Sequence, residues 1–175
     1  PGYDTTISGT TITNTKISDG EAVIKAKKTL NNAVPAEGQF TFQLLDANGD
    51  VVVEKTNDAS GIVTFDQLTY TEAKDYTYTI VEVMPKGATA ENNYTVNGMT
   101  YDPTEHTVTV EVKQEGTALV TTVTYNGTST EPPVFTNTYE AKEAELTLSL
   151  SKTLINGAEL PGQTQRTSAQ TQTSQ

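Results

Sequence analysis

Short runs in which apolar and polar residues alternate recur from about residue 20 to residue 140, and this pattern limits the fold more than any other feature. Alternation places one apolar face on a β-strand, whereas a helix needs a period of about 3.6 residues. The pattern predicts an all-β fold, a β-sandwich of antiparallel and mixed sheets. The expected strands are Ile24–Leu30, Phe40–Leu44, Val51–Glu54, Ile62–Phe65, Tyr76–Val83, His106–Lys113, Leu119–Tyr125 and Phe135–Tyr139.

Three polar residues, Lys28, Glu82 and Asn137, lie at positions where the alternation calls for apolar side chains. Burying an amine, a carboxyl and an amide is costly unless each finds a partner. We therefore expect the three side chains to meet in the core, where an amine and an amide can react. Lys25 and Lys27 fall on the opposite face, although a β-bulge in this strand would turn Lys27 inward instead of Lys28.

Each of these residues also has an ordinary structural interpretation when it is taken alone. A lysine near a strand end can keep its amine in water while its stem covers apolar surface. Glu82 alone would be a salt-bridge partner, and Asn137 alone a strand-end cap. The reactive interpretation rests on the three residues together.

Composition excludes several classes of function. The chain carries a formal charge of −11 with only 11 lysines and arginines, so it lacks the basic clusters that bind nucleic acid. It has no cysteine, one histidine and no stretch apolar enough to insert into a membrane. Asp46–Asp50 loosely resembles a calcium loop, but no glutamate closes it, and a hairpin turn at Asn48-Gly49 is expected instead. We predict no metal, no cofactor and no catalytic triad, with His106 in a structural role.

The two ends of the chain repeat parts of its middle. Residues 152–154 repeat Lys28–Leu30, and residues 12–15 repeat 135–138. This tandem repeat predicts four parts: the last strand of a preceding domain at 1–17, a complete domain at 18–140, the first strand of a following repeat at 141–163, and a low-complexity, disordered tail at 164–175. Asn14 and Lys152 are then candidate crosslink residues of the neighbouring, incomplete domains, and the chain is expected to be a piece of a longer protein.

Four motifs in order resemble the streptococcal pilin isopeptide-linkage domain, the FctA-type family. They are Lys28–Leu30, Gly38–Leu44, Tyr76–Val83 and Val134–Tyr139, and the resemblance covers roughly residues 20 to 140. Residues 2–15 resemble the end of a Cna B-type domain, a related module of Gram-positive surface proteins. The resemblance implies an Ig-like, Cna B-like sandwich.

The resemblance also implies an autocatalytic amide bond between Lys28 and Asn137, assisted by Glu82. A neutral amine is a nucleophile, and a protonated Glu82 would hydrogen-bond the amide carbonyl and shuttle protons as ammonia leaves. Tyr78, Phe135 and Tyr139 would keep water out. The reaction occurs once per molecule, so the chain is not expected to be an enzyme.

The function that follows is a structural stalk module of a pilus or cell-wall-anchored surface protein, outside a Gram-positive cell. Its partners would be neighbouring domains of the same polypeptide or pilin subunits. The alternative is a ligand-binding adhesin domain that recognises a host protein or glycan. Exposed tyrosines clustered in a concave site would favour the adhesin, whereas tyrosines buried beside Lys28 would favour the stalk.

Overall fold

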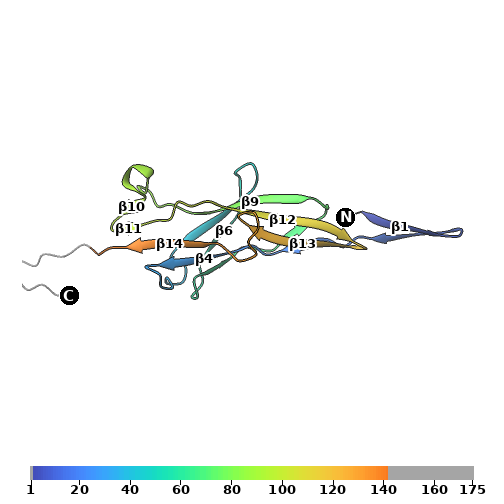
Figure 1. The fold of residues 1–175 in the computed structure, drawn as a ribbon, viewed down its shortest axis with the longest axis horizontal. Helices are drawn as coiled ribbons and strands as arrows, with labels where there is room; N and C mark the ends of the chain where they lie inside the picture. Colours follow the sequence, from blue (N-terminus) through green and yellow to red (C-terminus); the bar gives the residue numbers. More distant parts are fainter. Residues whose placement is uncertain (1, 142–175) are drawn as a thin grey trace, which may run out of the picture. The chain divides into compact units, whose positions relative to one another are not determined.

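The computed structural model describes residues 2–141, which form an all-β fold with one short 3-10 helix, η1 (Ala90–Asn92). Two five-stranded sheets and two two-stranded sheets make up this part of the chain (Figure 1). The expectations for a further strand, for Lys152 and for the tail after residue 163 lie outside the described residues. No helix in the described range is long and apolar enough to cross a membrane.

The first large sheet is antiparallel throughout and follows the order β13-β12-β9-β5-β6. The turn between β5 and β6 is a hairpin, as expected, because Oδ1 of Asp46 accepts hydrogen bonds from the N–H groups of Asn48 and Asp50. The strands are β5 (Thr41–Leu45), β6 (Val51–Thr56), β9 (Asp75–Glu82), β12 (His106–Glu115) and β13 (Ala118–Tyr125).

The second large sheet is mixed, and it brings the beginning and the end of the domain together. Its order is β10-β11-β14-β4-β7, and only the pairing of β14 with β4 is parallel (Figure 1). The strands are β4 (Lys25–Leu30), β7 (Ile62–Thr64), β10 (Thr95–Val96), β11 (Met99–Thr100) and β14 (Val134–Tyr139).

The two large sheets share one apolar core, which confirms the β-sandwich. Fully buried residues come from alternate positions of both sheets, as expected for strands with one apolar face. The core includes Ala26, Val63 and Phe135 from the mixed sheet and Phe42, Leu44, Ile80, Val108 and Val110 from the antiparallel sheet.

Several strands were not predicted from the sequence, because they are too short to show alternation. β3 (Gly20–Ala22) pairs with β8 (Leu68–Tyr70), and β10 and β11 have two residues each. Even so, β3 and β8 each add one buried residue, Ala22 and Tyr70, to the core.

Residues near the N-terminus form a hairpin of β1 (Tyr3–Ser8) and β2 (Thr11–Lys16), so they contain two strands and not the single strand expected. Its apolar residues are largely exposed, with Ile7 at 72% and Ile12 at 65%. Ile17 is the first buried residue of the described chain, and its N–H donates a hydrogen bond to the carbonyl of Gly2. Assignment of this hairpin to a preceding domain stays a prediction.

Candidate functional site

Lys28 points into the core, and its neighbouring lysines point away from it. In β4, Ala26 and Lys28 are buried, whereas Lys25 and Lys27 are exposed. The register of β4 against β7 runs without a shift, so no bulge turns Lys27 inward. The side chain of Lys28 is fully buried.

Asn137 and Glu82 reach the same place from different strands. Asn137 lies on β14, beside β4, in a register that sets Phe135 opposite Lys28 and Asn137 opposite Leu30. Glu82 is the last residue of β9, in the other sheet. The amine and the amide therefore belong to one wall of the sandwich, and the carboxyl belongs to the facing wall.

The Glu82 carboxyl bridges the other two side chains. Its Oε2 lies 2.7 Å from Nζ of Lys28, and its Oε1 accepts a hydrogen bond of 2.7 Å from Nδ2 of Asn137. Lys28 and Asn137 are 0% exposed and Glu82 is 4% exposed. The structure thus brings together all three of the residues that the alternation singles out.

Two phenylalanine rings, Phe40 and Phe42, lie near the amine, and Phe135 packs against Phe42; the three are named here the aromatic cage. Nζ of Lys28 lies 4.8 Å from the ring centre of Phe40 and 5.9 Å from that of Phe42. The Phe42 and Phe135 rings pack edge to face at 5.1 Å. Among the aromatics expected to exclude water, Phe135 is buried, but Tyr139 is 46% exposed because it lies at the outer end of β14.

Burial moves both ionisable groups toward their neutral forms. Desolvation lowers the pKa of Lys28, although the hydrogen bond and charge of Glu82 oppose this shift. Desolvation likewise raises the pKa of Glu82, against the opposing effects of Lys28 and Asn137. Transfer of one proton from Nζ to the carboxyl gives a neutral pair without changing the net charge of the site.

The carbonyl oxygen of Asn137 has a different partner from the one expected. Its Oδ1 accepts a hydrogen bond of 2.8 Å from the backbone N–H of Asp102, while Glu82 contacts the amide nitrogen. The expectation that Glu82 hydrogen-bonds this carbonyl is therefore not met. Asp102 lies in the irregular segment after β11, where no alternation exists to reveal it. The only sequence signal is the Asp-Pro pair at 102–103, which is typical of a turn.

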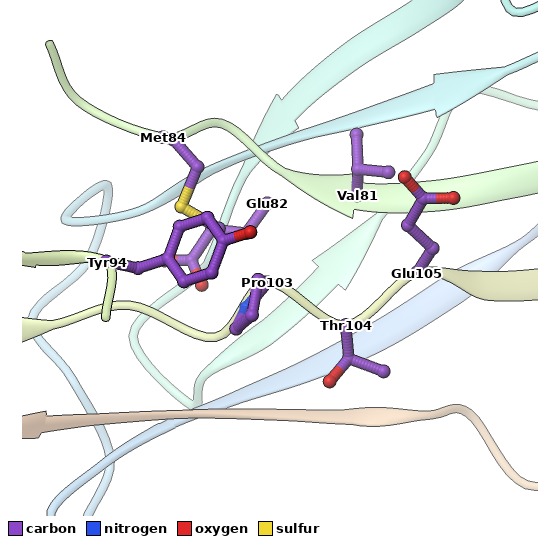
Figure 2. Close-up of a pocket in the computed structure, with 7 residues that line it drawn as sticks. All are labelled: Val81, Glu82, Met84, Tyr94, Pro103, Thr104 and Glu105. Carbon is purple, nitrogen blue, oxygen red and sulfur yellow. The ribbon is translucent and has the colours of Figure 1, made fainter. Parts of the chain in front are cut away.

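A surface pocket adjoins the buried site (Figure 2). One side comes from the end of β9 and the residues after it, and the other from the segment that follows Asp102. Glu82 itself is one of the residues that line the pocket. The lining residues are Val81, Glu82, Met84, Tyr94, Pro103, Thr104 and Glu105.

The remaining candidate residues lie elsewhere. Asn14 is exposed on β2, where its Oδ1 accepts a hydrogen bond of 2.8 Å from Thr5. His106 packs edge-on against Phe135, with ring centres 4.7 Å apart, and its Nδ1 lies 3.0 Å from the amide nitrogen of Asn126.

Comparison with known proteins gives one family match and several structural matches. The family model FctA, described as the Spy0128-like isopeptide containing domain, matches residues 24–140. The major pilin of Streptococcus pyogenes is 19% identical with a TM-score of 0.40, over 68% of this chain and 50% of that one. The T-13 major pilin of the same species is 15% identical with a TM-score of 0.44, over 71% and 55%. The chain thus spans about half the length of these pilins, and no curated protein matches it.

Proposed function

Because the chain belongs to the FctA family of Spy0128-like isopeptide containing domains, we propose that Lys28 and Asn137 form an intramolecular isopeptide bond with the assistance of Glu82. The observation that carries the proposal is the bridge of Glu82, which contacts the nucleophilic nitrogen and the departing nitrogen at 2.7 Å each. A buried ion pair alone does not require an amide on the second oxygen of the acid. Here the amide occupies that position.

The reaction begins with transfer of a proton from Nζ of Lys28 to Glu82. The neutral amine then attacks Cγ of Asn137, forming a carbon–nitrogen bond and moving the carbonyl electrons onto Oδ1. Glu82 passes its proton to Nδ2 and then, as a carboxylate again, takes the surplus proton from Nζ. The bond from Cγ to Nδ2 breaks and ammonia leaves. One amine and one primary amide thus give one secondary amide and one ammonia.

The folded domain supplies the rate enhancement by placing the groups in contact. Orientation within a rigid core replaces a bimolecular encounter, and the aromatic cage keeps water from the amine. Released ammonia would leave on the side of Glu82, which also lines a surface pocket (Figure 2). The reaction runs once in each molecule, so the residue set is a self-processing site.

The bond would tie the first long strand of the sandwich to its last. It closes a loop of 109 residues (137 − 28), which a chain-entropy model values at roughly 4–5 kcal/mol of stability. Since β4 and β14 are parallel neighbours, tension that enters at one strand would leave through the side-chain bond to the other. The intervening strands would carry no load.

This arrangement suits a load-bearing module, and we assign the chain to the stalk of a pilus or cell-wall-anchored protein on the outside of the cell. Residues 18–140 would be one such domain, joined to neighbouring domains or pilin subunits. Five of the eight tyrosines pack into or against the core instead of gathering on a concave surface, which favours the stalk over an adhesin. Tyr70 and Tyr125 are buried, and Tyr76, Tyr78 and Tyr101 pack partly buried against the core.

Intact mass spectrometry of the purified chain tests the crosslink. The wild-type mass is expected to be lower than the sequence mass by one ammonia, and Lys28→Ala, Glu82→Ala and Asn137→Ala are each expected to keep the full mass. Lys27→Ala is the matched control, because this exposed lysine on the same strand should leave the ammonia loss intact. A wild-type chain of full mass would refute the proposed bond.

A further inference from the structure

We propose that Asp102 is a further catalytic residue: its backbone N–H stabilises the oxyanion that forms on Asn137, and its carboxylate positions that N–H. This inference rests on the proposed isopeptide bond, and it concerns the oxygen of the reacting amide, to which Lys28 and Glu82 make no hydrogen bond.

The orientation of the Asn137 amide follows from the chemistry of its two partners. A backbone N–H can only donate a hydrogen bond, so the Asn137 atom 2.8 Å from the nitrogen of Asp102 must be the carbonyl oxygen. The amide nitrogen then faces Oε1 of Glu82 at 2.7 Å. The oxygen and the nitrogen of the reacting amide are thus served by two different groups.

This division matches what the reaction requires. Attack on Cγ places negative charge on Oδ1, and a donor already within 2.8 Å stabilises that charge without reorganisation. Because Asn137 is fully buried, such a hydrogen bond is stronger than it would be in water. The carboxyl of Glu82 is then left to move protons between the two nitrogens, which it contacts with separate oxygens.

The carboxylate of Asp102 holds this donor against the strand that carries Asn137. Oδ2 accepts a hydrogen bond of 2.8 Å from the N–H of Thr136, and Oδ1 accepts one of 3.0 Å from the N–H of Thr104. Thr136 immediately precedes Asn137 on β14. The hydrogen bond from Thr136 therefore holds Asp102 in a fixed position relative to the reacting residue. Pro103 helps by restricting Asp102 to extended backbone conformations.

The charge state of Asp102 agrees with this positioning role. Burial opposes ionisation, but hydrogen bonds from Thr104 and Thr136 outweigh it and lower the pKa of Asp102. The side chain is therefore an anion that only accepts hydrogen bonds, as both of its N–H partners require.

The decisive experiment removes the N–H and keeps the side chain of residue 102. The full chain is assembled from synthetic segments with malic acid, the α-hydroxy counterpart of aspartic acid, at position 102, which turns the amide N–H into an ester oxygen and keeps the carboxylate. The same exchange at Ser18, whose N–H bonds to Thr117 at 2.9 Å outside the site, is the matched control. Each chain is folded by dilution from denaturant, and ammonia loss is followed by mass spectrometry, with circular dichroism to verify folding.

The wild-type chain and the Ser18 ester should lose ammonia at equal rates, and the position-102 ester should react about 100-fold more slowly. Equal rates for all three would overturn the role of Asp102 while leaving the isopeptide bond in place. A wild-type chain that loses no ammonia would instead refute the bond, and with it this inference.

A second measurement decides the case if the ester chain does not fold. In isotope-labelled Lys28→Ala, which has no amine to react, NMR should detect coupling through the hydrogen bond between the Asp102 nitrogen and Cγ of Asn137. A folded variant without that coupling overturns the proposal. Asp102→Ala, which keeps the N–H but loses both acceptors, should slow ammonia loss, and Asp102→Asn, which retains one acceptor, should restore part of the rate.

Discussion

Nζ of Lys28 lies 2.7 Å from Oε2 of Glu82, although 54 residues separate them in the sequence and they come from opposite sheets of the sandwich. Both side chains are removed from solvent, so each is the main compensation for burying the other. The second oxygen of Glu82 is held by Asn137. Every substitution at this site therefore has a stability effect and a reactivity effect, and the two can be separated.

Replacement of Glu82 by glutamine is expected to abolish ammonia loss while changing the shape of the site little. Glutamine can hydrogen-bond both partners, but it cannot accept and return a proton. Its free energy of unfolding should also be about 3–5 kcal/mol lower than that of an uncrosslinked chain with Lys28, Glu82 and Asn137 in place, because the amine stays buried without its carboxyl. Mass spectrometry and urea denaturation measure the two effects. Full crosslinking of Glu82→Gln would show that the acid is not the proton shuttle.

The pH dependence of stability should reveal the buried amine in a chain that cannot crosslink, such as Asn137→Ala. In the folded chain the pKa of Lys28 is lowered below its ordinary value of 10.5, chiefly because of burial. At a pH between the folded pKa and 10.5, the unfolded chain therefore binds more protons than the folded one. Stability should therefore rise with pH as it approaches 10.5. Glu82 has a folded pKa above 4.5, again chiefly because of burial, so its contribution falls as pH rises from 4.5 toward the folded value.

Urea denaturation of Asn137→Ala across this pH range gives the measurement, with Lys28→Met/Asn137→Ala as the reference that lacks the amine. The difference in free energy of unfolding between the two chains should shrink or reverse at alkaline pH. In the crosslinked wild type the lysine nitrogen is an amide in both the folded and the unfolded state, so its alkaline rise should vanish. A pH-independent difference would contradict the lowered pKa of Lys28.

The sequence predicted the three buried polar residues because each lies on the same strand face as apolar neighbours two residues away. Lys28 alternates with Ala26, and no register shift in β4 breaks that relationship. Glu82 and Asn137 likewise occupy inward positions of β9 and β14. Alternation is a local property, so it survives without knowledge of which strands are neighbours.

Asp102 could not be found in this way, because its position depends on how an irregular segment lies against β14. Its three hydrogen bonds join it to Thr104, Thr136 and Asn137, and two of these partners are more than 30 residues away. The exposure of Tyr139 has a similar origin: its place in the alternation is inward, but it lies at the end of its strand, beyond the packed core.

Opening the aromatic cage is expected to slow the crosslink. The ring of Phe40 lies 4.8 Å from the amine, and Phe40→Ala would admit water, which stabilises the protonated, unreactive form of Lys28. The substitution should also cost about 3–5 kcal/mol of stability. Phe65→Ala is the matched control, since Phe65 is 1% exposed and lies outside the cage. If the two variants lose equal stability and only Phe40→Ala loses ammonia more slowly, the effect is on reactivity and not on packing. Equal rates of ammonia loss in Phe40→Ala and Phe65→Ala would contradict the role of the cage.

The load path predicts how the domain extends when it is pulled from its two ends. With the bond intact, the 108 residues between Lys28 and Asn137 (137 − 28 − 1) cannot straighten, because force passes from one side chain to the other. In Lys28→Ala the same residues are free to extend by about 3.3–3.6 Å each once the sandwich unfolds. Single-molecule stretching of a chain that carries residues 18–140 between reference domains should therefore show a long unfolding step in Lys28→Ala and none of that length in the wild type. Lys27→Ala, with its exposed side chain on the same strand, should behave as the wild type. A wild-type domain that extends as far as Lys28→Ala would show that tension does not pass through the bond, even where mass spectrometry has found it.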